Sequence, residues 1–366
     1  MTSLQEQLSR LSPEKRQLVL RKLQARSATS PASAELEGGP VVITNRGGPL
    51  PLSSAQQRLW FLDQLEGPGA AYIMTSAVRL RGRLDVGALL DSLREIVGRH
   101  EILRTTFWEE EGQPRQVISP ETRLDVEVFD WIGLGEKEQA ECVHRLIRSE
   151  AETPFDLKKG PLIRVKLGLS HPLSTGDGEG VLVLSMHHIV ADFWSMEVLI
   201  KEWKCLYEAR VEGHLADLKP LPIQYADYAA WERKLQSGGR RREHVDYWTT
   251  QLDGAPPVLE LPLDFIRPSA PSPREHRLFF EISSTLADGL RGVAQRCGAT
   301  PFMALQAVFA LLLARTSRQR DVVVGTVVAN RPRPELESMI GFFCQHPAAA
   351  PIPRWGSLVR GGSAPG

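Results

Sequence analysis

Two adjacent histidines and an aspartate form the part of the sequence best suited to chemistry. His187 and His188 directly follow an apolar run over 181–186, and Asp192 completes an HHxxxD pattern. Imidazole has an unperturbed pKa close to neutral pH, so a histidine at the end of a strand can accept or donate a proton. The pattern therefore indicates a site for proton transfer, the alternative being a chance match.

Periodicity predicts the elements that hold this motif in place. Strands are expected over 162–169 and 181–186, joined by a turn that contains Gly and Ser. A helix is expected over 193–209. The motif is thus expected in a short loop between a strand and a helix.

The rest of the chain shows the same alternation of strands and helices. Helices are predicted over 53–65, 85–98, 136–153, 223–235, 242–252, 284–297 and 301–316 (the last as a buried helix), and strands over 71–80, 115–118, 124–129, 276–282 and 321–328. This alternation in both halves predicts an α/β fold of two lobes with mixed sheets flanked by helices.

The composition is that of an ordinary globular protein with no excess of either charge. Of 366 residues, 42% are apolar and 24% are charged, as in ordinary globular proteins, and 44 Lys and Arg balance 44 Asp and Glu. A net charge of zero removes the electrostatic argument for binding to nucleic acid or to an anionic membrane. The length allows two domains or two lobes.

The cysteines predict neither a metal site nor a disulfide framework. They are widely spaced and form no CxxC pair, at Cys142, Cys205, Cys297 and Cys344. The first 26 residues lack the apolar segment of a secretory signal, and the longest apolar runs are too short to span a bilayer. These features favour a cytoplasmic protein.

The N-terminal residues predict a short helix followed by a linker. Ser12, Pro13 and Glu14 are typical of a helix start, and apolar residues recur at helical spacing over 12–25. Such a helix can pack on its own domain or recruit a partner in a multienzyme assembly, and the sequence favours neither. Residues 26–50 are rich in Ser, Ala, Gly and Pro, which is typical of a linker.

Together with the histidine motif, four further segments resemble one known family. They resemble, in order, the signature motifs of condensation domains of nonribosomal peptide synthetases, which belong to the HHxxxD acyltransferases. The matching segments are SSAQQRLWFL at 53–62, RHEILRTTF at 99–107, MHHIVADFWS at 186–195, YADYAAW at 225–231 and IGFF at 340–343. Residues 325–331 also look like that family. The resemblance covers roughly residues 48–343.

This resemblance implies a fold, partners and a reaction of secondary metabolite biosynthesis. It implies two lobes like those of chloramphenicol acetyltransferase, arranged in a V with a tunnel between them. Upstream and downstream carrier proteins of adjacent synthetase modules would each present an acyl group on a phosphopantetheine arm. The acceptor's amine would attack the donor thioester, and no cofactor or metal bound by the chain itself is implied.

The resemblance also assigns roles to single residues. A thioester is already activated, so the enzyme must mainly supply proximity and manage one proton. His188 is expected to hydrogen-bond the amine or accept its proton, and His187 to fix the loop. Asp192 is expected to form a structural ion pair with Arg164. The loop or tunnel would be completed at Phe193, Trp194 and Ser195.

One of these positions departs from the family. Most members have Gly where Phe193 stands, and Gly leaves room for a close approach to the reacting centre. A bulky ring at this position narrows that space. We expect an unusual donor, as in members that are fed by polyketide modules, with a damaged site as the competing interpretation.

The end of the sequence departs further and completes the predicted domain organisation. We expect an N-terminal helix and linker over 1–47, an N-lobe over 48–215, a partial C-lobe over 216–343 and an aberrant tail over 344–366. The family continues after residue 343 with a strand resembling Val-Asn-Thr-Leu. One inserted base would turn such codons into Cys-Gln-His-Pro, the residues found here, so our hypothesis is a shifted reading frame; the alternative is a divergent tail.

Three other functions stay open at this point. A non-catalytic, condensation-like module would only bind carrier proteins. An epimerisation domain also uses HHxxxD, although the complete segments at 53–62 and 99–107 favour condensation. Acyl transfer from free coenzyme A uses the same fold.

Overall fold

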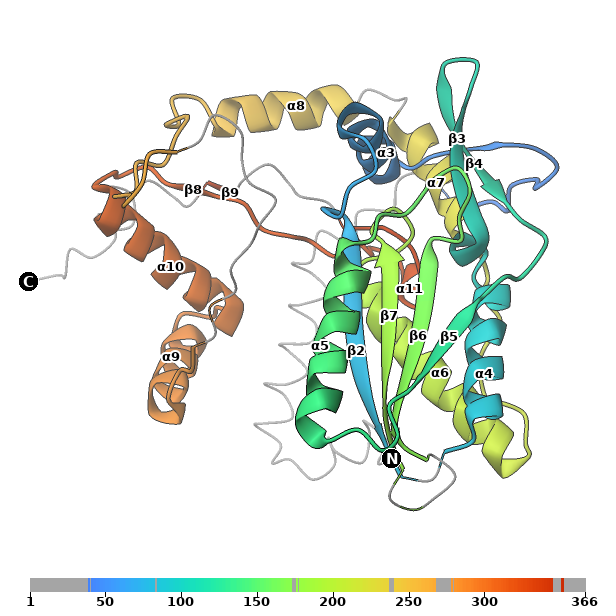
Figure 1. The fold of residues 1–366 in the computed structure, drawn as a ribbon. Coiled ribbons are helices and arrows are strands. Elements are labelled where there is room, and N and C mark those ends of the chain that lie inside the picture. The colour runs from blue at the N-terminus through green and yellow to red at the C-terminus, as the bar shows by residue number, and fades with distance from the viewer. Residues whose placement is uncertain are drawn as a thin grey trace, which may run out of the picture.

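The computed structural model describes residues 39, 41–82, 84–172, 176, 178–236, 240–267, 278, 280–344 and 350–351. Figure 1 shows a larger body around a central sheet and a smaller group of elements set apart from it. The predicted helix over 12–25 lies outside the described residues, as do most of the predicted linker and of the tail.

The central sheet is mixed, as predicted. Its strands follow the order β2 (Ile73–Arg81), β7 (Glu179–His187), β6 (Ile163–His171) and β5 (Val126–Asp130). The strands β2 and β6 run antiparallel to β7, whereas β5 is parallel to β6. Residues 180–187 of β7 are all buried, because this central strand is covered on both faces and its sequence is correspondingly apolar.

Helices cover both faces of this sheet (Figure 1). The helix α5 (Glu136–Glu152) crosses one face, and α6 (Phe193–Glu212) lies on the other, where it packs against α4 (Val86–Arg99). The indole Nε1–H of Trp203 donates to the Leu89 carbonyl at 3.1 Å and joins these two helices.

A second, smaller sheet adjoins the body. Its strands β1 (Leu50–Pro51), β4 (Gln113–Ile118) and β3 (Thr105–Glu110) are antiparallel, and a short 3-10 helix (Glu101–Arg104) precedes β3. Near them lie α3 (Ser54–Glu66) and α7 (Tyr225–Gln236). The helix α3 begins with a capping box, in which Ser53 accepts from the Gln56 amide and Gln56 accepts from the Ser53 amide.

The second half of the chain contributes α8 (Arg240–Gln251), α9 (Ser284–Arg296), α10 (Pro301–Ser317), β8 (Val323–Val324), α11 (Pro334–Glu337) and β9 (Ala350–Pro351). The short pair β8 and β9 is antiparallel, which gives a strand to a segment where none was predicted. The strand predicted over 276–282 is wrong at 280–282, which have no regular structure; 276, 277 and 279 are not described.

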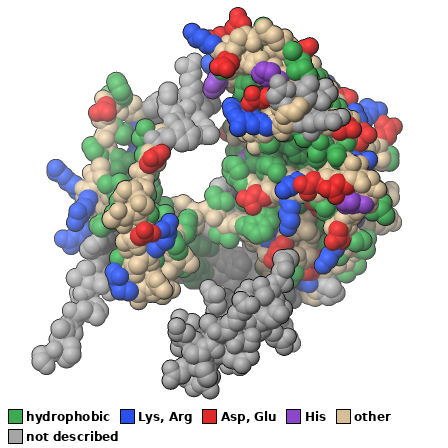
Figure 2. All heavy atoms as spheres, turned by 90° about the horizontal axis from the view of Figure 1, so that it is seen from below, with side chains coloured by type: hydrophobic (Ala, Val, Ile, Leu, Met, Phe, Trp, Pro, Cys, Tyr) green, Lys and Arg blue, Asp and Glu red, His purple; other side chains and the backbone are tan. Residues whose placement is uncertain are grey.

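The prediction that the helix over 301–316 is buried is wrong. Most of its large apolar side chains are exposed, Leu311 and Leu313 are half-buried and Ala310 is buried. Figure 2 shows hydrophobic side chains on the surface of this smaller group. Within the described residues α10 packs mainly on α9, and one helix cannot cover a surface that is apolar all round. The exposed set is Phe302, Met303, Leu305, Val308, Phe309 and Leu312.

Among the described residues, no single helix is long and apolar enough to cross a membrane. The bent pair α9 and α10, at 105° to each other, meets the requirements of length and composition only when the two helices are taken together. The apolar character of α10 accounts for this result.

The linker prediction is wrong for its last ten residues. Arg46 forms a bidentate ion pair with the Asp227 carboxylate on α7, with N–O distances of 2.6 and 2.9 Å. The Thr44 amide donates to the same carboxylate, and Leu50 enters β1. One arginine therefore fastens a segment whose composition alone is typical of a linker.

A single hydrophobic core joins the two halves of the chain. Leu336, Met339, Ile340, Phe342 and Phe343 belong to the same buried cluster as the strands β6 and β7. A segment predicted to lie in the C-lobe is thus packed into the body that carries the histidine motif.

Candidate active site

The histidine loop continues directly from β7 and is held by backbone hydrogen bonds. The His187 amide donates to the Leu162 carbonyl at 3.1 Å, and the His188 amide donates to the Tyr72 carbonyl at 2.8 Å. The Val190 amide then donates back to the His187 carbonyl at 3.0 Å and turns the chain toward α6. Both histidines therefore have fixed backbone positions, as expected for the end of a buried strand.

His187 has a structural environment. Its side chain is only 3% exposed, and its Nδ1 accepts a hydrogen bond from the Ile189 amide at 3.0 Å. A ring nitrogen that accepts from N–H carries no proton, so the proton of the neutral ring is on Nε2. Burial, and secondarily the nearby His188, lowers the pKa of His187 to about 4. It is therefore neutral near pH 7 and fixes the loop.

The imidazole ring of His188 is oriented by a contact with the backbone of its own loop. Its Nδ1 lies 3.2 Å from the Ala191 carbonyl oxygen, which can only accept, so Nδ1 carries the proton. The neutral ring then has its lone pair on Nε2. The rings of Phe193 and Phe342 flank the imidazole, with centroids at 6.1 and 5.8 Å.

Asp192 does not pair with Arg164, and this prediction is wrong. The Asp192 carboxylate is completely buried and lies 3.1 Å from a terminal nitrogen of Arg331. It also caps α6 by accepting from the Ser195 amide at 2.8 Å and accepts from the Phe343 amide at 3.2 Å. Its structural role is as expected, but its partner comes from a segment 139 residues away.

Arg164 is occupied elsewhere. Its Nε donates to the Glu150 carboxylate on α5 at 2.9 Å, its guanidinium lies 3.8 Å from the Phe155 ring centre, and it donates to the Thr153 carbonyl. It alternates along β6 with side chains that face the core, and this face of the strand points toward α5. Arg164 therefore fastens α5 to the sheet and is not part of the site.

The three residues that follow Asp192 do not share one role. Phe193 is 75% exposed and Trp194 is 42% exposed, so both can line a substrate passage. The Trp194 indole also donates to the Glu337 carbonyl at 2.8 Å. Ser195 is completely buried and cannot contact substrate, which corrects its assignment to the loop or tunnel.

The segments that resemble family motifs meet at this loop. The Gln56 side chain donates to the Ile189 carbonyl at 3.1 Å, and the Tyr225 hydroxyl donates to the Phe342 carbonyl at 2.5 Å. The Ile340 amide donates to His100 Nδ1 at 3.4 Å. His100 in turn donates from Nε2 to Glu202 at 2.8 Å and joins α4 to α6.

Arg331 is a site residue that the sequence did not single out. Its terminal nitrogens donate to the carbonyls of Leu336 and Met339 and to the Ser195 hydroxyl, and its guanidinium lies 4.0 Å from the Phe343 ring centre. The only available signal was its place in a segment, 325–331, that resembles the family. Nothing in the sequence indicates that Arg331, and not the nearby Arg333, pairs with Asp192.

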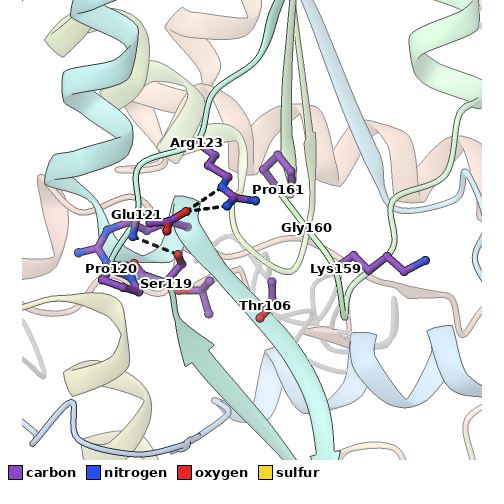
Figure 3. Close-up of a pocket in the computed structure, with 10 residues that line it drawn as sticks. Thr106, Ser119, Pro120, Glu121, Arg123, Lys159, Gly160 and Pro161 are labelled. Atoms are coloured by element: carbon purple, nitrogen blue, oxygen red, sulfur yellow. Dashed lines mark hydrogen bonds and ion pairs between the residues drawn. The ribbon is translucent and has the colours of Figure 1, made fainter.

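A cavity of about 350 Å³ lies beside the start of β6 (Figure 3), and no residue of the histidine loop lines it. Its three cationic side chains already have partners. Arg123 pairs with Glu121 at 2.7 Å, Lys159 pairs with Asp156 at 3.5 Å, and Arg104 donates to the Ser119 carbonyl. Its lining residues include no histidine or cysteine.

No metal site is found in the described part of the chain, where no three side chains of His, Cys, Asp or Glu are placed to hold an ion.

Comparison with known proteins decides the family, because the condensation domain model matches residues 47–346. The chain belongs to the condensation domain family. Phosphinothricin tripeptide synthetase PhsC of Streptomyces viridochromogenes is 40% identical over 346 residues, which are 94% of this chain and 31% of that protein. Malpinin synthetase of Mortierella alpina is 40% identical over 312 residues, or 85% of this chain and 4% of that protein. This chain therefore spans less than a third of the length of either relative.

Solved structures agree with the α/β fold. The X-domain from teicoplanin biosynthesis is 31% identical, with a TM-score of 0.70 over 86% of this chain and 67% of that one. The first condensation domain of the CDA synthetase is 24% identical, with a TM-score of 0.67 over 84% of this chain and 70% of that one. At this identity, the second comparison shows the fold alone.

Proposed function

We propose that this condensation domain forms an amide bond between an acyl or peptidyl donor and an aminoacyl acceptor, each attached to a carrier protein. The family match and the relatives among synthetases support this reaction class. The orientation of His188 is the observation that carries the proposal, because the lone pair on Nε2 can accept a hydrogen bond from an attacking amine.

The proposed reaction balances without an external reagent. The acceptor's amine nitrogen attacks the carbonyl carbon of the donor thioester, the C–N bond forms and the C–S bond breaks. The sulfur leaves as a thiolate and takes up the proton that the amine loses. His188 hydrogen-bonds the amine or carries this proton for part of its path.

Most of the rate enhancement is proposed to come from positioning. A thioester is activated, and two tethered substrates held in one site react as if at high local concentration. The proposed partners are upstream and downstream carrier proteins in adjacent synthetase modules. Their phosphopantetheine arms supply the thiols, and the chain itself binds no cofactor in this scheme.

The experiment measures amide product from carrier-bound donor and acceptor. His188→Ala should lower the product by about 100-fold or more, in the range of one general acid–base contact. His214→Ala, which removes an exposed histidine just beyond the end of α6, is the matched control and should retain activity.

Two outcomes would contradict the proposal. Undiminished turnover by His188→Ala would remove the catalytic role of the motif. Carrier binding without any product from the unmutated chain, unaffected by His188→Ala, would identify a non-catalytic module that only recruits carrier proteins.

A further inference from the structure

Three consecutive residues beside the histidine loop are held by side chains from the start of α6 and from α7. The Gly341 amide donates to the Ser195 hydroxyl at 3.0 Å, and the Phe342 carbonyl accepts from Tyr225 at 2.5 Å. The Phe343 amide donates to Asp192 at 3.2 Å. The backbone that presents the Phe342 side chain is therefore fixed on both sides and at its own carbonyl.

The Ser195 hydroxyl contacts Asp192, Arg331 and Gly341 in this arrangement. It is completely buried in the first turn of α6 and lies 2.7 Å from Asp192 Oδ1 and 2.8 Å from the Gly341 carbonyl, to either of which it can donate. It also accepts from the Gly341 amide and, at 2.9 Å, from Arg331. One side chain thus uses its donor and both of its acceptor positions.

The backbone at Gly341 is also in close contact with the Tyr225 ring, which prevents it from moving toward α7. A Cβ atom at this position would lie 1.9 Å from the Tyr225 ring, so the backbone passes directly against that ring. With Ser195 on one side and Tyr225 on the other, the Phe342 ring is directed to His188, at a centroid distance of 5.8 Å.

We propose that Ser195 is a positioning residue whose buried hydroxyl holds residues 341–342 against α6 and thereby keeps the Phe342 ring on the His188 imidazole. The ring excludes water from one face of His188 and limits its rotation away from the Ala191 carbonyl. This inference deepens the proposed function and rests on it for its catalytic meaning, but not for its structural test.

The structural test uses NMR of the full chain with labelled histidine, which needs no activity. A phenyl ring at this distance shifts the His188 Hε1 resonance through its ring current. Ser195→Ala should move that resonance, and Phe342→Leu should move it in the same direction. Ser92→Ala is the matched control, since this buried α4 hydroxyl donates only to its own helix at Ala88 and lies apart from the loop.

The kinetic test compares the same variants with carrier-bound substrates. Ser195→Ala should lower kcat about 10-fold with little change in KM, because substrate does not touch this residue, and Phe342→Leu should act in the same sense. An unchanged His188 resonance in a folded Ser195→Ala variant would overturn the inference. Ser195→Ala could shift the His188 resonance while His188→Ala leaves turnover unchanged. That pair of results would overturn the proposed function alone.

Discussion

Asp192 and Arg331 form an ion pair across 139 residues of sequence, with 3.1 Å between carboxylate and guanidinium and both side chains almost completely buried. Removal of one partner from such a pair leaves a buried charge without compensation. Asp192→Ala should therefore lower the free energy of unfolding by about 3–5 kcal/mol. Burial, opposed by the charge of Asp192, already lowers the pKa of Arg331.

The measurement is chemical denaturation of the full chain, followed by tryptophan fluorescence. The double variant Asp192→Ala with Arg331→Met should be more stable than Asp192→Ala alone, because the uncompensated charge is gone. Arg148→Gln breaks the exposed pair with Glu152 and should leave the transition midpoint unchanged. If Asp192→Ala lowered the free energy of unfolding no more than Arg148→Gln does, the structural role of Asp192 would be contradicted.

The pairing of Asp192 marks the limit of what the sequence could predict. The strand β7, the loop and α6 were predicted because long apolar periodicity identifies them locally. The choice between Arg164 and Arg331 depends on which segment packs across α6, and that contact has no local signal. A strand is expected after Arg104, but its bounds were not predicted, since the sequence TTFWEE of β3 ends in charged residues that face solvent beside a turn at Glu111 and Gly112.

The lowered pKa of His187 predicts that the free energy of unfolding falls in mild acid. Its pKa of about 4 in the folded chain is below the ordinary value of 6.5, so the unfolded chain binds more protons between these values. Stability contributed by the neutral ring is therefore complete above about pH 6.5 and is lost as the pH falls toward 4. Between pH 7 and pH 5 this amounts to about 2 kcal/mol.

The test compares the unmutated chain with His187→Asn, whose amide oxygen can still accept from the Ile189 amide. Urea denaturation should show that the free energy of unfolding falls more between pH 7 and pH 5 in the unmutated chain than in His187→Asn. The difference between the two losses gives the contribution of His187 apart from the other titrating groups. Equal losses in both proteins would show that His187 titrates normally.

Cys344 should resist alkylation. Burial, and secondarily the charge of Asp192 at 3.6 Å from its sulfur, raises the pKa of this thiol to about 11. Only the thiolate reacts, and about 0.1% of such a thiol is ionised at pH 8. With iodoacetamide and peptide mass spectrometry, the exposed Cys297 should be modified first. Comparable rates at the two cysteines would contradict the contact with Asp192.

Phe193 should influence donor choice with little effect on folding. Its exposed ring meets the His188 imidazole edge-on at 6.1 Å, so it occupies space next to the proposed reacting centre. Phe193→Ala opens that space, and exposed substitutions usually change stability by about 0.5 kcal/mol or less. We expect the ratio of kcat/KM between a bulky and a small acyl donor to rise several-fold, as measured in competition between two loaded carriers.

The control for Phe193 is Phe61→Ala, which removes another exposed phenylalanine on the outer face of α3 and should leave the donor ratio unchanged. A wider passage favours bulky donors because the excluded volume near His188 falls, whereas a merely damaged site would slow both donors alike. An unchanged ratio with an unchanged rate would show that Phe193 does not contact the donor. A rate that rises equally for both donors would mean that the ring obstructs the site without selecting between acyl groups.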